Sequence, residues 1–256
     1  MPTTAAILAG GRGTRLRPIL ADRPKALAVV GSKPVIDHQL QWLRRQGVER
    51  VVLLTGHLGE KLREHCGDGG RWRLKLLYSH EAEPKGTAGA LRLARDLLPR
   101  TFWVVNGDTL IDLPLGPPWS WHHQHGGPVT IVMSLEPAEA PVDGEGDYGR
   151  ALVDASGLVR AFKEKGSAGR GGAPDPSDKV CVNAGVYLLD RRVVDLVPPD
   201  RFCSLEDDIF PGLLGRLRAF VTTEPFYDIG TPARYRLACA SWRNVHDLPE
   251  QGPPPR

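Results

Sequence analysis

The chain has 256 residues, of which 41% are apolar and 25% are charged, and its formal net charge at pH 7 is only +3. This length and apolar content allow one domain with a sizeable core, and the scattered basic residues disfavour nucleic acid as a partner. The apolar runs are much shorter than the roughly 20 residues that a membrane-spanning helix needs, and the N-terminus lacks the pattern of a secretion signal. We therefore expect a cytoplasmic protein that binds neither nucleic acid nor membranes.

Four cysteines stand far apart in the sequence. They form no Cys-x-x-Cys pair and have no histidines at ligand spacing, so zinc and a disulfide framework are both disfavoured. We expect reduced packing residues at Cys66, Cys181, Cys203 and Cys239.

The first half of the chain alternates between short apolar runs and helical patterns. Buried strands are predicted over Thr4–Ala9, 51–54, 74–78 and 102–105. Helices are predicted over 34–46, Gly59–Cys66 and 87–98. The first helix is opened by Pro34 and ended by Gly47. This alternation predicts an α/β fold, with a Rossmann-like, mostly parallel twisted sheet and helices on both of its faces.

The second half has a different pattern, because its apolar runs are separated mainly by loops. Mixed or antiparallel strands are predicted over 129–135, 158–162 and 180–189, followed by a helical pattern over 205–217. Glycine, proline, serine and alanine dominate 166–178, which is a candidate mobile loop. We expect a single domain over 1–245, with two halves (about 1–112 and 113–245), and a flexible tail over 246–256.

Gly10, Gly11 and Gly13 follow the first predicted strand. A turn without Cβ atoms lets backbone N–H groups approach an anion closely, and phosphate is the natural candidate. Glycines in this position also serve as an ordinary tight turn. The run matches neither a P-loop nor the dinucleotide fingerprint, since Leu16 stands where the last glycine of the fingerprint is required.

Four cations lie within or just beyond the glycine turn: Arg12, Arg15, Arg17 and Lys25. Cations beside a phosphate-binding turn neutralise a triphosphate and stabilise the pyrophosphate that leaves. Arg12 and Arg17 are the weaker members, and exposed arginines are often merely solvated.

Six blocks of sequence resemble those of the sugar-1-phosphate nucleotidylyltransferases. The first is Gly10-Gly11-x-Gly13-Thr14-Arg15-Leu16-x-Pro18 followed by Pro24-Lys25. The others are Gly86-Thr87-Ala88-Gly89, Asn106-Gly107-Asp108, Phe162-x-Glu164-Lys165, Asn183-Ala184-Gly185 and Tyr227-Asp228-Ile229-Gly230. The resemblance covers nearly the whole chain and implies the nucleotide-diphospho-sugar transferase fold, with a nucleotide-binding half (about 1–112) and a sugar-binding half (113–245). One departure is Ala26, where the family more often has a proline.

The resemblance implies a role for each block. It implies nucleotide binding by Leu8, Ala9, Gly10, Gly11, Gly13, Thr14, Arg15, Gly86, Thr87 and Asp108. It implies sugar phosphate binding by Gly107, Glu164, Lys165, Asn183 and Gly185. It also implies that Asp108 and Asp228 bind Mg2+, a cation that usually takes one or two carboxylates together with phosphate oxygens, and that Arg15 and Lys25 are catalytic.

Most of these blocks also have a plainer interpretation. Thr87 is a suitable N-cap, and Gly86 and Thr87 open a helix whose unpaired N–H groups could bind a base or a phosphate. Glu164 and Lys165 could be a solvated pair, and Asn183-Ala184-Gly185 could be a β-bulge.

The implied reaction joins a nucleoside triphosphate to a sugar 1-phosphate and releases pyrophosphate. Segments 183–189, 204–211 and 227–232 look most like D-glycero-α-D-manno-heptose 1-phosphate guanylyltransferases, which implies GTP and a heptose. The chain is also similar to enzymes that use N-acetylmuramate, mannose or glucose 1-phosphate with UTP, GTP or dTTP. A catalytically inert, nucleotide-sugar-binding regulatory protein is the alternative from another class, although Arg15, Lys25, Asp108 and Asp228 are all present.

Overall fold

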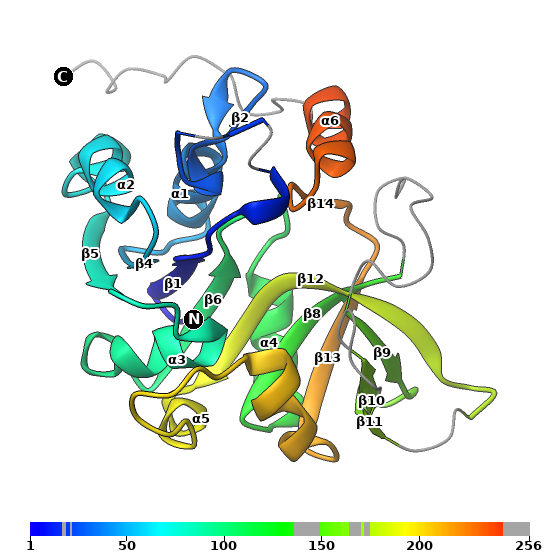
Figure 1. The fold of residues 1–256 in the computed structure, drawn as a ribbon. Helices are drawn as coiled ribbons and strands as arrows, with labels where there is room; N and C mark the ends of the chain where they lie inside the picture. Colours follow the sequence, from blue (N-terminus) through cyan, green and yellow to red (C-terminus); the bar gives the residue numbers. More distant parts are fainter. Residues whose placement is uncertain (17–18, 21, 136–148, 164–169, 172–174, 243–256) are drawn as a thin grey trace, which may run out of the picture.

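The computed structural model describes residues 1–16, 19–20, 22–135, 149–163, 170–171 and 175–242. A ten-stranded sheet runs through this part of the molecule, and helices lie against it (Figure 1). Its main path has the order β11-β10-β9-β12-β6-β1-β4-β5, and β8 and β13 join beside β12.

One half of the sheet is parallel. It contains β1 (Thr4–Ala9), β4 (Arg50–Thr55), β5 (Lys75–His80) and β6 (Thr101–Asn106). The connections between them carry α1 (Val35–Arg45), α2 (Gly59–Cys66) and α3 (Gly86–Leu93). The predicted alternation of strands and helices is therefore confirmed.

Successive side chains of the parallel strands point to opposite faces of the sheet. On one face Ile7 and Leu53 pack with Leu40 of α1. On the other face Ala6 and Val52 pack with helix α3. Both faces are thus covered by helices, which explains why these strands read as continuous apolar runs.

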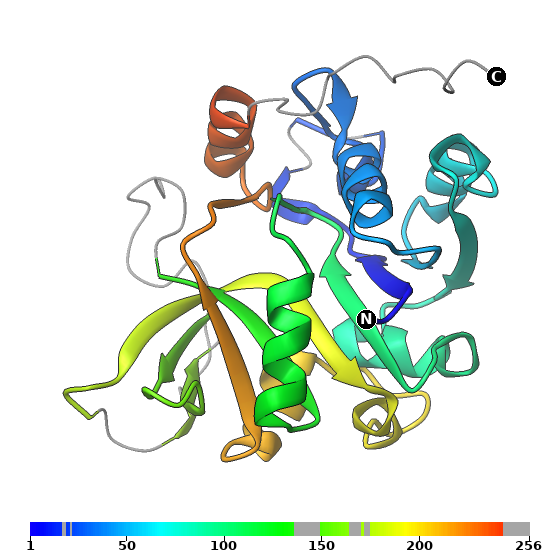
Figure 2. The ribbon, with the colours of Figure 1, turned by 180° about the vertical axis from the view of Figure 1, so that it is seen from behind.

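The other half of the sheet is mixed, as predicted. Its strands are β8 (Val129–Ser134), β9 (Arg150–Val153), β10 (Val159–Lys163), β11 (Arg170–Gly171), β12 (Lys179–Asp190) and β13 (Leu217–Thr222). Strand β12 is antiparallel to β6, β8 and β9, whereas β13 is parallel to β8. Figure 2 shows α4 (Gly116–His125) on the back of this half, where it contacts β8 and β13.

Small elements complete the described chain. Two short ribbons pair β2 (Val29–Val30) with β3 (Lys33–Pro34), and β7 (Thr109–Ile111) with β14 (Phe226–Asp228). Helix α5 (Arg191–Asp195) follows β12, and α6 (Pro232–Ser241) follows β14 and contacts β2. None of the described helices has the length and apolar character needed to span a bilayer.

Some predicted boundaries were wrong. The pattern over 205–217 is not one helix, because a π-helical turn (Leu205–Ile209) and a 3₁₀ turn (Phe210–Leu213) precede β13. Pro211 lacks an N–H group, and Gly215 has φ +84°, so a continuous helix cannot form. The helix predicted over 87–98 ends at Leu93 and is followed by a short 3₁₀ turn.

Candidate active site

A cavity of about 340 Å3 opens at the carboxyl ends of the parallel strands. This edge is where open α/β sheets bind ligands. Its walls come from the ends of β1, β4, β5 and β6, from the start of α3 and from the segment before the π-helical turn. The lining residues are Leu8, Ala9, Gly10, Gly11, Arg12, Lys25, Ala26, Leu54, Glu81, Pro84, Gly86, Thr87, Ala90, Asn106, Gly107, Asp108 and Phe202.

Glycine suits this edge because two of its positions are closely packed. A Cβ atom on Gly10 would overlap the Glu81 carboxylate, and one on Gly107 would lie 2.6 Å from the Leu8 carbonyl oxygen. The turns after β1 and β6 therefore pack tightly together, with their backbones forming the floor of the cavity. Gly13 and Thr14 follow this turn but lie outside the lining.

The predicted cations are distributed unevenly. Lys25 lines the cavity, and its Nζ lies 3.1 Å from Asp108 Oδ2. Arg12 also lines the cavity, although it was predicted to be one of the weaker members of the cluster. Arg15 is exposed on a 3₁₀ turn (Thr14–Leu16) outside the lining, so its catalytic role stays a prediction. Arg17 lies outside the described residues.

Asp108 and Asp228 come together although 120 positions apart in sequence numbering. The ribbon of β7 and β14 pairs Asp228 with Thr109, and the Ile229 N–H donates to the Asp108 carbonyl at 3.0 Å. Burial and the neighbouring Asp108 carboxylate raise the pKa of Asp228. Arg234 Nη1, 3.2 Å from Asp228 Oδ2, acts in the opposite direction.

This donor set fits a magnesium ion that arrives with a triphosphate. Two carboxylates close enough to raise a pKa are suited to share a hard cation, and Mg2+ commonly takes few protein ligands. Within the described ranges there is no cluster of three or more metal-ligating side chains, so phosphate oxygens and water would supply the remaining ligands.

Gln39 is a positioning residue that the sequence analysis missed. It is buried on α1, and its Nε2 donates to the carbonyl oxygens of Asn106 at 2.8 Å and Thr109 at 2.7 Å. These two bonds hold the turn that carries Asp108. A polar residue on the apolar face of the helix, next to Leu40, was the available signal.

Glu81 is a second missed residue. It is buried at the end of β5 and lines the cavity, and its Oε2 accepts the Lys85 N–H at 2.9 Å. Burial raises the pKa of this carboxyl. The signal was an acidic residue directly after a buried strand and shortly before Gly86 and Thr87.

The start of α3 differs from both interpretations of its sequence. The N–H groups of Ala88 and Gly89 donate to the Cys203 carbonyl, at 2.9 and 3.1 Å, so they are not unpaired. Thr87 is not the N-cap, because its hydroxyl donates to Glu206 at 2.8 Å and accepts from the Leu205 N–H at 2.7 Å. Gly86 and Thr87 still line the cavity, and nucleotide binding by them stays a prediction.

Of the residues predicted to bind the sugar phosphate, Gly107 lines the cavity, whereas the others lie beside it or outside the described ranges. Asn183 and Gly185 lie at a register shift of β12, which agrees with the plainer interpretation of this block as a β-bulge. An added Cβ on Gly185 would approach Asn106 Nδ2 to 2.9 Å, so the bulge backs onto the cavity wall. Glu164 and Lys165 lie outside the described residues, as does the tail over 246–256.

The sequence pattern of the family described as Nucleotidyl transferase matches residues 4–243. The chain belongs to this family. Among curated relatives of this nucleotidyl transferase, mannose-1-phosphate guanylyltransferase 1 of Arabidopsis thaliana is 36% identical over 239 residues, covering 90% of this chain and 62% of that protein. The mannose-1-phosphate guanylyltransferase catalytic subunit beta of Drosophila pseudoobscura pseudoobscura is 33% identical over 236 residues, covering 90% and 60% respectively. The nucleotidyl transferase thus spans about three-fifths of the length of these relatives.

Solved structures agree with the family assignment. HddC from Yersinia pseudotuberculosis complexed with GMP-PN is similar with a TM-score of 0.74 and 29% identity. The similarity covers 94% of this nucleotidyl transferase and 99% of the HddC chain. It confirms the predicted α/β fold with a central, mostly parallel sheet.

Proposed function

We propose that this protein transfers GMP from GTP to a sugar 1-phosphate, forming a GDP-sugar and releasing pyrophosphate. The family assignment supports nucleotidyl transfer. The names of the curated relatives and the guanine nucleotide in the HddC structure support the choice of GTP.

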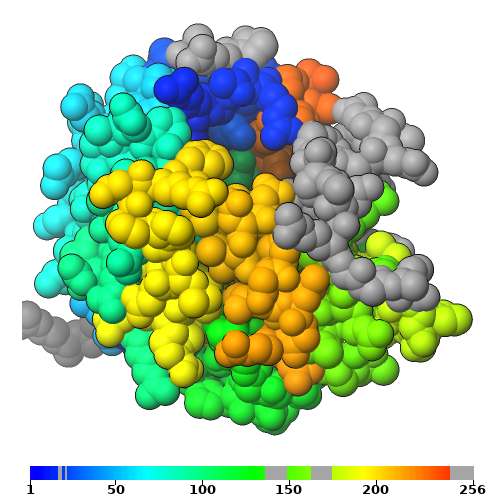
Figure 3. Space-filling model, turned by 60° about the horizontal axis from the view of Figure 1, so that its bottom comes forward, coloured from blue at the N-terminus to red at the C-terminus, as the bar shows by residue number. Residues whose placement is uncertain are grey.

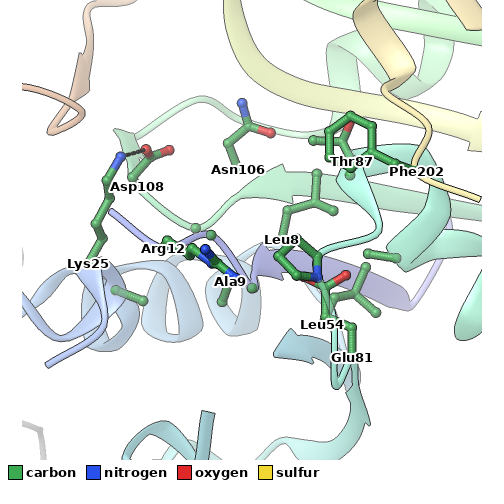
Figure 4. A pocket seen from close by; sticks show the side chains of 17 residues that line it. Leu8, Ala9, Arg12, Lys25, Leu54, Glu81, Thr87, Asn106, Asp108 and Phe202 are labelled. Atoms are coloured by element: carbon green, nitrogen blue, oxygen red, sulfur yellow. Dashed lines mark hydrogen bonds and ion pairs between the residues drawn. The ribbon is translucent and has the colours of Figure 1, made fainter. Parts of the chain in front are cut away.

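The observation that carries this proposal is the chemistry at the two ends of the cavity. Figure 4 shows the Lys25–Asp108 pair at one end and Glu81 at the other. The first end suits a triphosphate. The second suits guanine, because N1–H and the 2-amino group are adjacent donors and a carboxylate accepts two parallel hydrogen bonds. Uracil and adenine lack this pair of donors.

Apolar side chains between these ends suit the flat faces of a base. Leu8 and Leu54 line the cavity near Glu81, and the Phe202 ring stands at its edge (Figure 4). Ala90 also belongs to the lining. Phe202 is 63% exposed, so its ring is accessible to a bound base. We infer that the base lies between these groups, with its polar edge toward Glu81.

In the proposed reaction an oxygen of the sugar 1-phosphate attacks the α-phosphorus of GTP. A new O–P bond forms, the bond from the α-phosphorus to the bridging oxygen breaks, and pyrophosphate leaves with that oxygen. The attacking oxygen is already anionic, so no enzyme nucleophile is needed and catalysis consists of positioning and charge neutralisation.

Lys25, Arg12 and the N–H groups of the glycine turn would supply this neutralisation. Asp108 holds the Lys25 ammonium at the phosphate end of the cavity. Asp108 and Asp228 would hold Mg2+, which neutralises phosphate charge when bound. Arg15 could join the phosphates if the Thr14–Leu16 turn moves inward on binding.

For the sugar 1-phosphate, D-glycero-α-D-manno-heptose 1-phosphate is our first candidate, and mannose 1-phosphate is the second. The resemblance of segments 183–189, 204–211 and 227–232 favours the heptose, and the names of the curated relatives favour mannose. We assign the sugar phosphate to Gly107, Asn183, Gly185, Glu164 and Lys165. Because β12 pairs with β6, β8 and β9, we propose that both halves form one catalytic domain.

The test is magnesium-dependent pyrophosphate release with each of GTP, UTP, ATP and CTP. Each nucleotide is paired with the 1-phosphates of the heptose, mannose, glucose and N-acetylmuramate. We expect the highest kcat/KM with GTP and the heptose, followed by GTP and mannose. A preference for UTP would contradict the assignment of GTP, and no release from any pair would favour the inert regulatory protein.

A further inference from the structure

Glu206 is a buried carboxylate that has no part in the proposed reaction and does not line the cavity. Its two oxygens accept hydrogen bonds from three hydroxyl groups. The donors are Thr87 at 2.8 Å, Tyr187 at 2.9 Å and Ser204 at 3.0 Å. A buried carboxylate is costly unless donors of this kind surround it, so its presence calls for an explanation.

The first arm of this network is the series of hydrogen bonds through Thr87, and it reaches the cavity lining at the start of α3. Thr87 lines the cavity, and its hydroxyl is used twice, since it donates to Glu206 and accepts from the Leu205 N–H. The Cys203 carbonyl also accepts two N–H groups of α3, and the Cys203 N–H donates to the Lys85 carbonyl at 2.8 Å. Figure 3 shows the chain around 203–205, in yellow, against the blue-green surface that carries α3.

The second arm, through Tyr187, leads toward the lining residue Asn106. The Tyr187 hydroxyl donates to Glu206 Oε1 and accepts from Asn183 Nδ2 at 2.9 Å. Asn183 Oδ1 in turn accepts the Gly185 N–H at 2.9 Å, which fixes the bulge of β12 behind Asn106. Asn106 lines the cavity.

We propose that Glu206 is a positioning residue that fixes where the start of α3 and the bulge of β12 lie relative to each other beside the cavity. This inference rests on the proposed function, because that relative position matters only if two substrates meet there. The links through Glu206, Thr87 and Tyr187 are hydrogen bonds of 2.7 to 2.9 Å, and Tyr187 is fully buried, so a movement of the start of α3 or of the β12 bulge strains the same carboxylate. A misplacement of about 1 Å costs roughly a hundredfold in rate when two reactants must be aligned.

The third arm supplies a matched control. The Ser204 hydroxyl donates to the same carboxylate, but it otherwise only accepts the N–H groups of Glu206 and Asp207 at the start of the π-helical turn. These hydrogen bonds of Ser204 do not reach the cavity lining. Removing this hydroxyl therefore disturbs Glu206 locally while leaving both other arms intact.

The test compares Tyr187→Phe and Glu206→Gln with Ser204→Ala. For each variant, kcat, the KM of GTP, the KM of the sugar 1-phosphate and Tm are measured. We expect the first two variants to lose roughly ten- to hundredfold in kcat, with each KM changed by less than about threefold because the binding groups themselves remain. We expect Ser204→Ala to lower Tm while keeping kcat within about twofold of the wild type.

Tyr187→Phe keeps the inference testable even if Glu206→Gln does not fold, because it removes one oxygen atom from a ring of unchanged shape. If Tyr187→Phe lowers Tm but keeps kcat within about twofold of Ser204→Ala, Glu206 is only structural and the inference is wrong. If the wild type releases no pyrophosphate from any substrate pair, the proposed function fails and the inference falls with it.

Discussion

Asp108 connects three groups at the phosphate end of the cavity. It pairs with Lys25, raises the pKa of Asp228 and receives the Ile229 N–H on its carbonyl. Its side chain therefore has two functions in our account, which are to orient a cation and to provide a ligand for magnesium. Its carbonyl only connects β14 to the turn.

Replacing this carboxylate should separate catalysis from folding. For Asp108→Asn we expect kcat to fall by about a hundred- to thousandfold, the usual cost of removing one preorganised charge. The backbone bond to Ile229 remains, so Tm should change little. Asp112→Asn is the control, because it makes the same chemical change in the exposed pair with Arg45. Near-normal pyrophosphate release by Asp108→Asn would contradict the assignment.

Replacing Glu81 should change which nucleobase the protein prefers. In Glu81→Gln an amide NH₂ replaces one acceptor, so guanine loses a hydrogen bond, whereas xanthine offers a carbonyl at the same position. We expect kcat/KM for GTP to fall by about ten- to hundredfold, since a hydrogen bond to a charged group contributes about 1.5–3 kcal/mol. The value for XTP should rise.

The control for this exchange is Glu83→Gln, which changes an exposed glutamate in the same turn. An unchanged ratio of GTP to XTP in Glu81→Gln would mean that Glu81 serves only to accept the Lys85 N–H.

At the scale of elements, the site depends on hydrogen bonds between segments that are distant in sequence. Gln39 connects α1 to the turn between β6 and β7, and Glu206 connects the π-helical turn to α3 and β12. The predicted helix over 205–217 is broken here. The irregular turn that replaces it carries Glu206.

Gln39→Met tests the hydrogen bonds that connect α1 to the turn after β6. Methionine fills a similar volume but donates no hydrogen bond, so the carbonyls of Asn106 and Thr109 lose a partner. We expect a loss of about 1–3 kcal/mol in the free energy of unfolding, and a fall in kcat because the turn carrying Asp108 is no longer fixed. Gln41→Met, on the same helix but half-buried, should leave both quantities nearly unchanged. Equal effects of the two substitutions on kcat would refute a positioning role for Gln39.

The sequence predicted the regular elements well because each depends on a local pattern. Thr4–Ala9 and Gly59–Cys66 were predicted with the bounds they have. The glycine turn was also predictable, since glycines directly after a strand mark a turn, and at Gly10 the lack of a Cβ leaves room for the Glu81 carboxylate. Glu81, Gln39 and Glu206 were not predicted as site residues. Their importance comes from partners up to 119 positions away, and no periodic pattern marks such a partner.

At the scale of the whole molecule, the cavity lies in the parallel half of the sheet. Strand β12 brings the mixed half next to the cavity, because it pairs with β6. A ligand that bridges these parts should stabilise the folded protein. At a hundred times its dissociation constant a ligand contributes about 2.7 kcal/mol, so we expect GTP with magnesium to raise Tm by about 5–10 °C. ATP should have a much smaller effect, and equal shifts would contradict selection of guanine by Glu81.

The most direct test of the account follows the α-phosphorus of GTP. GTP labelled at that atom is incubated with the protein, magnesium and the heptose or mannose 1-phosphate, and the products are separated. We predict that the label appears in the GDP-sugar and that the released pyrophosphate is unlabelled. Label recovered only as GTP, GDP or GMP would contradict nucleotidyl transfer.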